Sequence, residues 1–438
     1  MLQKIDDLYD YLAKREQRFG MNFGLERMEE MLKGLDVKHQ QLKFVHLAGT
    51  NGKGSTLHYL KNILAAGGYR VATFTSPHIE SVTERIMIND ERISEQDFLR
   101  LFNRVMGYIE SLEKKDIFPT QFEILTIIAL MYFEEQKPDL VLMETGLGGR
   151  LDSTNVITSL ISIITSISKD HTNILGDSIS GIAFEKAGII KENSYVITGV
   201  TDEEALTVIQ NKAQEKHCVL YELDNHIHLE HLLSTDGGEE FSYSFQNHTF
   251  EKWMIPMLGK HQIQNASLAI TAAILLNEKC GFQLKDEHIQ GGLMQSKWKG
   301  RLETVSTKPH IIVDGSHNEA GIRALIETLQ ERYSHKKIIF VTAALADKDV
   351  SSMMGMLEQV AHHIICTQFT MDRALEAEKL VLSCKHTPSS YFESWEEAID
   401  KGIQMMDENT LLVVTGSLYF LYYVRPYFLE KNQTELLS

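Results

Sequence analysis

The sequence predicts an α/β protein with a parallel β-sheet in its first part and a second α/β domain in its last part. Short apolar segments of strand length alternate with longer segments of helical periodicity, which is typical of βαβ units. Glycine-rich runs follow two of the predicted strands. The chain has 438 residues, and a length of roughly 150 residues per domain allows two or three domains.

The first βαβ unit surrounds a glycine-rich loop. Leu42–Leu47 is a short apolar strand that leads directly into the loop Gly49–Ser55. Apolar residues at helical spacing predict a helix over Ser55–Ala66, and Tyr69–Phe74 is the next buried strand. A strand, loop, helix and strand in this order form a crossover connection, which implies a parallel sheet.

Polar side chains follow the predicted strands of this part of the chain. Glu144 comes after the apolar strand Leu140–Met143, and His171 follows the strand Leu160–Ile167. Ser76 comes shortly after the second strand of the first unit. Sites in open α/β sheets gather at the carboxyl ends of strands. We therefore expect these three side chains at one site.

The βα alternation stops and then restarts. Alternating residues between 220 and 256 predict a small antiparallel insertion, and Gln264–Leu276 has helical spacing. The segment Trp298–Arg301 is a plausible hinge, which gives predicted domains over residues 1–297 and 298–438. The second domain contains four predicted strands, Ile311–Val313, Ile338–Val341, His363–Cys366 and Leu411–Val414.

Composition limits the class of protein. The formal net charge of −17 opposes non-specific nucleic-acid binding, so no nucleic-acid partner is expected. The longest apolar stretches are too short to cross a bilayer, and the N-terminal segment lacks the apolar core of a signal peptide. The four cysteines show no zinc or disulfide spacing. We expect a soluble cytoplasmic protein without a membrane partner.

The loop Gly49–Ser55 predicts a phosphate site. Backbone N–H groups of glycine loops bind phosphate oxygens, and the positive end of the following helix adds to the attraction. Lys53 would reach the β- and γ-phosphates of a nucleotide, which we expect to be ATP. Gly54 separates Lys53 from Ser55, so the loop is a variant of the ordinary form, in which lysine directly precedes serine or threonine.

Magnesium accompanies transferred phosphates and prefers carboxylate, hydroxyl and water ligands. Glu144 is the best carboxylate by position. Taken alone, Glu144 could equally be a capping residue, His171 a loop histidine and Ser76 a turn residue. Their joint placement favours a metal site. Lys186, on the helical stretch Ile179–Ile190, has the surroundings of a solvated helix lysine.

A set of short motifs runs along the chain from about residue 20 to 425. The motifs are, in order, HLAGTNGKGS, FTSPHI with ERI, FEILT, ETGLGGRLDSTN, KDH, FEKAGII, GKHQIQNA, WKGRLE, DGSHN, DKD and VTGSLY. Taken together, these motifs resemble the folylpolyglutamate synthase/dihydrofolate synthase family. GTNGKGS alone is typical of the broader Mur ligase superfamily, whereas GLGGRLD with FEKAGI and DGSHN is more specific to the folate branch.

The resemblance implies a P-loop-type parallel-sheet domain that binds ATP, joined to a smaller Rossmann-like α/β domain. It implies an ATP-dependent ligase that adds L-glutamate to tetrahydrofolate, and to dihydropteroate, through an acyl phosphate. ATP and Mg²⁺ would be the cofactors, and the protein would be a monomer.

The resemblance also implies roles for individual residues. Lys53, Lys186 and His171 would be catalytic, with Lys186 carbamylated. The implied magnesium ligands are Ser76, Glu144 and His171. The implied nucleotide contacts are Gly49, Thr50, Asn51, Gly52, Lys53, Gly54, Ser55, Asn265, Arg301, Asp314 and His317. The implied substrate contacts are Thr120, Gln121, Phe122, Leu151, Asp152, Ser153 and Ser417, with a possible contribution from Gly24, Leu25, Glu26 and Arg27.

Two other functions fit parts of the sequence. A Mur-type cell-wall ligase shares the glycine loop, but GLGGRLD and the short segment of about 40 residues before the loop speak against it. A nucleotide-gated binding module would hydrolyse ATP indifferently to glutamate. The run Gly146–Gly149 lacks the spacing of a dinucleotide fingerprint, so no nicotinamide cofactor is expected.

Overall fold

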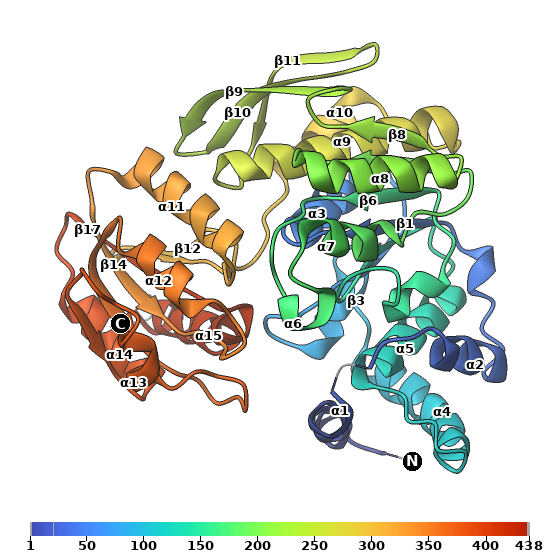
Figure 1. The fold of residues 1–438 in the computed structure, drawn as a ribbon, viewed down its shortest axis with the longest axis horizontal. Coiled ribbons are helices and arrows are strands. Elements are labelled where there is room, and N and C mark those ends of the chain that lie inside the picture. Colours follow the sequence, from blue (N-terminus) through green and yellow to red (C-terminus); the bar gives the residue numbers. More distant parts are fainter. Residues whose placement is uncertain (1, 21, 436–438) are drawn as a thin grey trace.

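Two β-sheets lie side by side in the molecule, each covered by helices (Figure 1). The computed structural model describes residues 2–20 and 22–435. The first sheet has eight strands in the order β4-β3-β2-β5-β1-β6-β7-β8, and the second has six in the order β12-β13-β17-β14-β15-β16. A separate three-stranded sheet has the order β11-β10-β9. This arrangement confirms the predicted α/β fold class.

The first sheet is parallel from β2 to β8. Its central strands are buried throughout, as expected for a sheet with helices on both faces. The antiparallel strands β3 and β4 extend one edge. The strands are β1 (Phe44–Ala48), β2 (Val71–Phe74), β3 (Ile86–Ile88), β4 (Glu91–Arg92), β5 (Leu140–Glu144), β6 (Ile161–Ile164), β7 (Tyr195–Thr198) and β8 (Val219–Glu222).

Helices cover both faces of this sheet. One face packs on α3 (Lys53–Ala66), α9 (Lys260–Lys279) and α10 (Asp286–Met294). The other face packs on the N-terminal and middle helices and on the pair α7 and α8. These are α1 (Ile5–Phe19), α2 (Glu26–Gly34), α4 (Glu95–Glu113), α5 (Gln121–Gln136), α7 (Ile179–Ala187) and α8 (Glu203–Glu215).

Helix α5 is apolar on all sides because it is enclosed by protein. Its residues from Glu123 to Phe133 are all buried. Thr120 caps it: the Thr120 hydroxyl accepts a hydrogen bond from the Glu123 N–H, and the Glu123 carboxylate accepts one from the Thr120 N–H. No described helix combines the length and apolar character that a membrane span requires.

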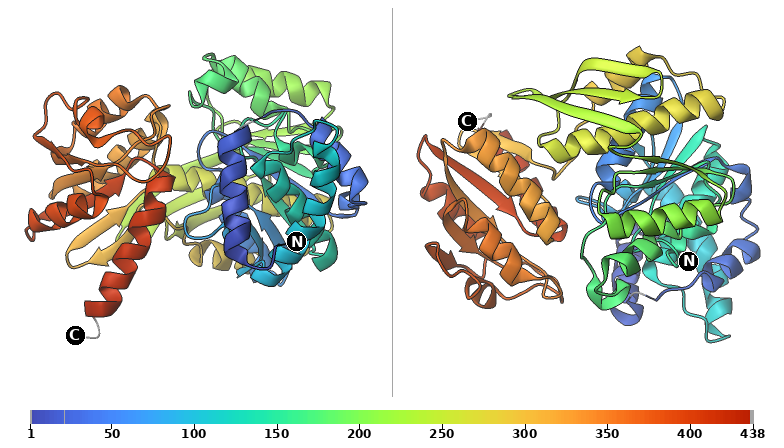
Figure 2. Two further views of the ribbon diagram at one scale, coloured as in Figure 1. Left: turned by 90° about the horizontal axis from the view of Figure 1, so that it is seen from below. Right: turned by 45° about the horizontal axis from the view of Figure 1, so that its top comes forward.

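The predicted antiparallel insertion is confirmed. Strands β9 (Ile227–Thr235), β10 (Gly238–Phe245) and β11 (His248–Ile255) form a ribbon that packs against α9. The turn between β9 and β10 extends beyond the first sheet toward the second one (Figure 2). The ribbon therefore contacts both halves of the chain.

The second sheet is also parallel, except for its first strand β12. One face packs on α11 (Glu319–Tyr333), α12 (Val350–Leu357) and α13 (Ala377–Val381), and the other on α14 (Trp395–Gln404) and α15 (Leu418–Glu435). The strands are β12 (Glu303–Thr307), β13 (His310–Val313), β14 (Lys337–Thr342), β15 (Ala361–Cys366), β16 (Ser389–Tyr391) and β17 (Thr410–Thr415).

Several predicted boundaries were wrong. The strand predicted over Leu160–Ile167 ends at Ile164, because Thr165 and Ser166 turn to bond the glycine loop. The helix predicted over Gln264–Leu276 is longer at both ends. The hairpin strands β3 and β4 were missed, since they are too short for a periodic pattern.

Candidate active site

The glycine loop joins β1 to α3 at the carboxyl edge of the first sheet. Neighbouring backbone anchors it: the Thr50 N–H donates to Ser166 O at 2.8 Å, and the Asn51 N–H donates to Ser166 Oγ at 3.0 Å. The Lys53 ammonium donates back to Gly49 O at 2.9 Å. The loop is thus held in shape by contacts outside the concave side where a phosphate would bind.

Two of the loop glycines are required by their surroundings. Gly49 has φ 153° and an added Cβ would lie 1.9 Å from Thr165 Oγ1. Gly52 has φ 87° and an added Cβ would lie 2.2 Å from Asn265 Oδ1. Residues with a side chain would be strained and would clash at both positions. The second contact places Asn265 of α9 directly against the loop.

A cavity opens above the loop, and we call it the phosphate-loop cavity. Residues 49–54 form its floor. Around it lie the three side chains expected at strand ends, Ser76, Glu144 and His171, together with Lys186 and Arg301. The prediction that strand ends would bring these polar groups together is confirmed by this geometry.

The phosphate-loop cavity fits a magnesium ion bound together with phosphate. Among the described residues, no group of three His, Cys, Asp or Glu side chains forms a complete metal cage. Glu144 offers one buried carboxylate, fixed by a hydrogen bond of 3.1 Å from the Ser76 N–H. Burial raises the Glu144 pKa, and Lys53 and Arg301 oppose that rise. Magnesium commonly takes one or two protein carboxylates and completes its shell with phosphate oxygens and water.

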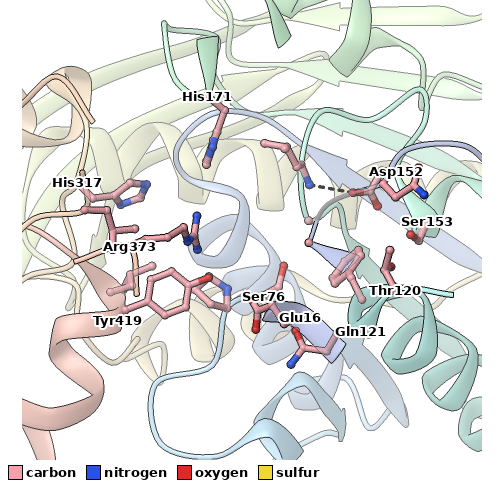
Figure 3. Close-up of a pocket in the computed structure, with 18 of the residues that line it drawn as sticks. Glu16, Ser76, Thr120, Gln121, Asp152, Ser153, His171, His317, Arg373 and Tyr419 are labelled. Atoms are coloured by element: carbon pink, nitrogen blue, oxygen red, sulfur yellow. Dashed lines mark hydrogen bonds between the residues drawn. The ribbon is translucent and has the colours of Figure 1, made fainter. Parts of the chain in front are cut away.

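His171 can present a neutral imidazole to this cavity. Burial lowers the pKa of His171 to about 4, although Asp170 opposes the shift. The residue begins the short helix α6 (Thr172–Leu175) with a positive φ of 50°. The His171 side chain lines this cavity and also the neighbouring cavity drawn in Figure 3.

Lys186 is buried, so its interpretation as a solvated lysine was wrong. Only 4% of the residue is exposed. Burial, with Lys53 nearby, lowers the Lys186 pKa to about 7. Within the described part of the chain, no partner forms a hydrogen bond or ion pair with its amine. The amphipathic pattern of the short α7 did not reveal which of its faces turns toward the cavity.

A second and larger cavity lies between the two halves, and we call it the interdomain cavity. Thr120, Gln121, Asp152 and Ser153 line its N-terminal wall, while His317, Arg373 and Tyr419 face them from the C-terminal half (Figure 3). Ser76, Pro77, Gly146 and Leu147 line both cavities. A ligand in the interdomain cavity would therefore adjoin whatever occupies the phosphate-loop cavity.

Two charged groups in the interdomain cavity are buried. Asp152 accepts hydrogen bonds from the Leu147 N–H and from Thr154, and burial raises its pKa. Arg85 is 7% exposed, donates to His78 Nδ1 at 3.0 Å, and has its pKa lowered by burial. It forms no ion pair with any described residue. A buried guanidinium without a carboxylate partner fits an anionic ligand.

Direct contacts close the cleft beside these cavities. Asn51 and Asn318 exchange two amide hydrogen bonds of 3.0 Å. Asp170 accepts a hydrogen bond from Lys348 at 2.5 Å and from Asn318 at 2.9 Å. Although burial would raise the Asp170 pKa, His317 and Lys348 hold it below its usual value. We call Asn51, Asn318, Asp170 and Lys348 the cleft contacts.

Comparison with known proteins shows the family of the chain. Residues 47–273 match the Mur ligase middle domain, and residues 300–418 match the Mur ligase glutamate ligase domain. The chain is 39% identical over 410 residues to the dihydrofolate synthase/folylpolyglutamate synthase of Bacillus subtilis, covering 93% of this chain and 95% of that protein. The chain belongs to the folylpolyglutamate synthase/dihydrofolate synthase family.

Solved structures of this family have the same fold. Folylpolyglutamate synthase from Mycobacterium tuberculosis in complex with ADP superposes with a TM-score of 0.91, at 28% identity, covering 97% of this chain and 99% of that one. A bifunctional folylpolyglutamate synthase/dihydrofolate synthase with Mn, AMPPNP and L-glutamate bound gives 0.85, at 29% identity, covering 97% and 98%. The resemblance inferred from the motifs is confirmed.

Most residues implied by the folylpolyglutamate synthase motifs line one of the two cavities. The phosphate-loop cavity contains Gly49, Thr50, Asn51, Gly52, Lys53, Gly54, Arg301 and Lys186, and the interdomain cavity contains Thr120, Gln121, Phe122, Leu151, Asp152, Ser153 and Ser417. Ser76, His171 and His317 line both, and Glu144 lines the first.

A few implied residues lie behind these walls. Ser55 is buried in the first turn of α3. Asp314 accepts hydrogen bonds from the Leu302 and Ser316 N–H groups, and so shapes the hinge. Of the described residues lining either cavity, none comes from Gly24–Arg27. In that segment, Arg27 donates a hydrogen bond to the buried carboxylate of Glu123.

Sequence reasoning assigned no role to several residues that line the cavities. Arg85, Asp170, Lys348 and Tyr419 stood inside quoted motifs (ERI, KDH, DKD and VTGSLY), so the signal was available. Arg373 and Glu16 lie outside any motif, and only tertiary packing brings them to the interdomain cavity.

Proposed function

We propose that this protein is an ATP-dependent ligase that joins L-glutamate to the carboxyl group of tetrahydrofolate, and also to dihydropteroate, through an acyl phosphate. The wall shared by the two cavities carries the proposal. An acceptor in the interdomain cavity would present its carboxylate past Ser76 and Gly146 to the phosphates above the glycine loop. A carboxylate beside a nucleotide phosphate is the arrangement that acyl phosphate formation needs.

The chain's own residues can support each step. Lys53 and Arg301 offset the negative charge of the γ-phosphoryl group as the acceptor oxygen forms the new P–O bond and ADP leaves. The glutamate amine then attacks the acyl carbon, loses a proton, and the C–O bond to phosphate breaks. The closed cleft keeps water away from the acyl phosphate.

Ser76, Glu144 and His171 would hold a magnesium ion against the phosphate oxygens. When bound, Mg²⁺ supplies charge neutralisation to the transferring phosphoryl group. The buried Glu144 carboxylate would be the anchoring ligand, and the neutral ring of His171 leaves a nitrogen lone pair available.

We also propose that Lys186 is carbamylated. Its amine is buried, it has no hydrogen-bond partner among the described residues, and its lowered pKa of about 7 provides neutral amine near physiological pH. Neutral amines react with CO₂, and the resulting carbamate would place a negative charge beside Lys53 and the magnesium ligands.

One assay tests the proposed activity. ADP release is measured with tetrahydrofolate or dihydropteroate, with and without L-glutamate. We expect steady-state ADP release to require ATP, the acceptor and L-glutamate together. Release that ignores L-glutamate would exclude the ligase and leave a nucleotide-gated module; activity restricted to a nucleotide-sugar acceptor would indicate a cell-wall ligase.

Isotope transfer tests the intermediate separately. With ¹⁸O in the acceptor carboxylate, the acyl phosphate route predicts one ¹⁸O atom in the released phosphate. Phosphate free of ¹⁸O would contradict the route even if the amide product forms.

Three further features belong to the proposal. The functional division lies at residues 297/298, within the segment that leads from α10 to β12. The protein acts as a monomer in the cytoplasm. Sedimentation of the native protein with and without substrates tests the monomer.

A further inference from the structure

An ion pair outside the linings of both cavities joins the two halves of the molecule. Glu239 of the ribbon strand β10 accepts a hydrogen bond from the Arg332 Nη1–H at 3.0 Å, and Arg332 belongs to α11 of the C-terminal half. Their side chains are 1% and 8% exposed. Arg332 Nη2 also donates to the carbonyl of Thr235 in the ribbon turn.

Glu239 also binds the residue that precedes helix α9. Its Oε1 accepts the Gly259 N–H at 2.8 Å, just before α9 begins. An added Cβ on Gly259 would lie 2.6 Å from Thr328 Oγ1 of α11, so the two helices meet there without space between them. We call Glu239, Arg332, Thr235 and Gly259 the ribbon joint.

In the ribbon joint both carboxylate oxygens of Glu239 have hydrogen-bond partners within the protein, unlike those of a surface ion pair. The second carboxylate oxygen of Glu239 accepts hydrogen bonds from Ser234 at 2.5 Å and forms a contact of 3.1 Å with His231 Nε2. A buried and fully bonded ion pair adds little net stability, but it fixes one arrangement, because moving either partner leaves an unpaired buried charge.

Three groups of contacts among the described residues link the two halves. One lies at the covalent hinge, where Gly300 has φ 66° and its carbonyl accepts the Gly315 N–H. Beside Gly300, Glu80 of the N-terminal half forms ion pairs with Lys299 and Arg425. The second group is the ribbon joint, with the surface ion pair of Lys260 and Glu331 next to it. The third is the set of cleft contacts, which lies where substrates must enter and leave and so must open. A rigid body held at two points can only rotate about the line that joins them.

We propose that the ribbon joint acts with the hinge as the axis of cleft opening, and that Glu239 and Arg332 are positioning residues for the ligase reaction. Rotation about this axis separates Asn318 and Lys348 from Asn51 and Asp170 and returns them in register. Helix α9 begins at the joint and carries Asn265 to the phosphate loop, so the axis and the loop share one rigid element.

The test replaces Arg332 by glutamine. We expect kcat to fall about tenfold, because the C-terminal residues return to the cleft in the correct orientation less often. The KM for ATP should change less than threefold, since the phosphate loop itself is untouched. Small-angle scattering of the substrate-free variant should give a larger radius of gyration than the native protein.

A matched control spans the same joint on the surface. Lys260 of α9 and Glu331 of α11 form an exposed ion pair of 3.2 Å, with side chains 59% and 34% exposed. Glu331→Gln should leave kcat and scattering unchanged. An equal loss in this control would overturn the role of the buried pair.

The remaining outcomes are decisive as well. Folded Arg332→Gln protein with native kcat and native scattering would refute the axis. If Arg332→Gln does not fold, Arg332→Lys carries the test: it keeps the charge, loses the second donor to Thr235, and should show the same changes to a smaller degree. The rate measurement rests on the proposed function, whereas scattering does not, so failure of the ligase assignment and failure of the axis are distinguishable.

Discussion

The two cavities of this protein are built in opposite ways. The floor of the phosphate-loop cavity is one continuous loop of six residues, shaped by backbone hydrogen bonds and by two glycines that no other residue could replace. The interdomain cavity has no such floor. It is assembled from side chains that lie as far apart in sequence as Glu16 and Tyr419, and its two walls belong to different halves of the molecule.

This difference separates two tasks. A backbone loop binds the phosphate groups of a nucleotide in a fixed way, because the chemistry of phosphate does not vary between acceptors. Side chains on facing walls can move apart and reclose, so they suit an acceptor that enters, reacts and leaves longer by one residue. We expect substitutions at the loop to abolish turnover and substitutions at the walls to alter the choice and affinity of the acceptor.

The strongest test of the loop is Lys53→Ala. We expect turnover to fall by roughly 10³-fold, because a cation at the transferring phosphoryl group is lost. ADP release at saturating substrates measures it, and thermal unfolding should be unchanged. Lys252→Ala on the ribbon, where the side chain is 69% exposed, is the control. Near-native turnover in Lys53→Ala would contradict the proposed contact between Lys53 and the transferred phosphoryl group.

Lys186→Ala should lower turnover by about 10²-fold, the cost typical of losing a group that orients metal ligands. Short carboxylic acids should restore part of the activity by replacing the carbamate. The Lys186 pKa of about 7 sets a pH dependence in the native protein: below it the amine is protonated and cannot react with CO₂. Activity should therefore respond to added bicarbonate more strongly at pH 6 than at pH 8.

The carbamate prediction has two clear contrary results. One is an unmodified Lys186 in crystals of active protein. The other is a Lys186→Ala variant that carboxylic acids do not rescue at any concentration below that which unfolds the protein.

Arg85→Gln tests the interdomain cavity. Because Arg85 is buried and forms no ion pair with any described residue, we expect it to bind a carboxylate of the acceptor, and its loss should raise the acceptor KM by about 10–100-fold. The KM for ATP should stay within about twofold, which is the contrast between the two cavities. An equal rise in both would show that Arg85 supports the structure and not the acceptor. Steady-state titration of each substrate gives both values.

Asp170→Asn probes the boundary between the cavities. It weakens the ion pair with Lys348 and should lower kcat about tenfold, which corresponds to a rise of ~1.4 kcal/mol in the activation free energy. The double variant with Lys348→Gln should lose little more than either single variant. Independent, multiplicative losses would mean that the two residues do not act as a pair.

The same contrast explains what could be predicted from the sequence. The loop, the strands that flank it and the polar residues at their ends are contiguous in the chain, so their periodicity and spacing identified them. Ser76, Glu144 and His171 were expected together, because parallel strands end at one edge of a sheet. The folate motifs then supplied the reaction.

The rest depends on tertiary packing. Nothing in the spacing of α7 indicates that Lys186 turns inward, and nothing near Arg373 indicates that its side chain lines the interdomain cavity. The joint between Glu239 and Arg332 pairs residues 93 positions apart in two otherwise ordinary amphipathic segments. Such contacts have no local signature, because they form only when tertiary packing brings both partners together and buries them as a pair.

Ser76 and Pro77 line the phosphate-loop cavity, the interdomain cavity, and also a third cavity beside the hinge that contains His58 and Trp298. One short turn is thus within reach of all three spaces. A single inhibitor that carries a phosphate mimic and an acceptor mimic on a short linker would pass over this turn and occupy two spaces at once. Binding of the second group would then be intramolecular, so its affinity should exceed that of either fragment by the effective concentration that the linker provides.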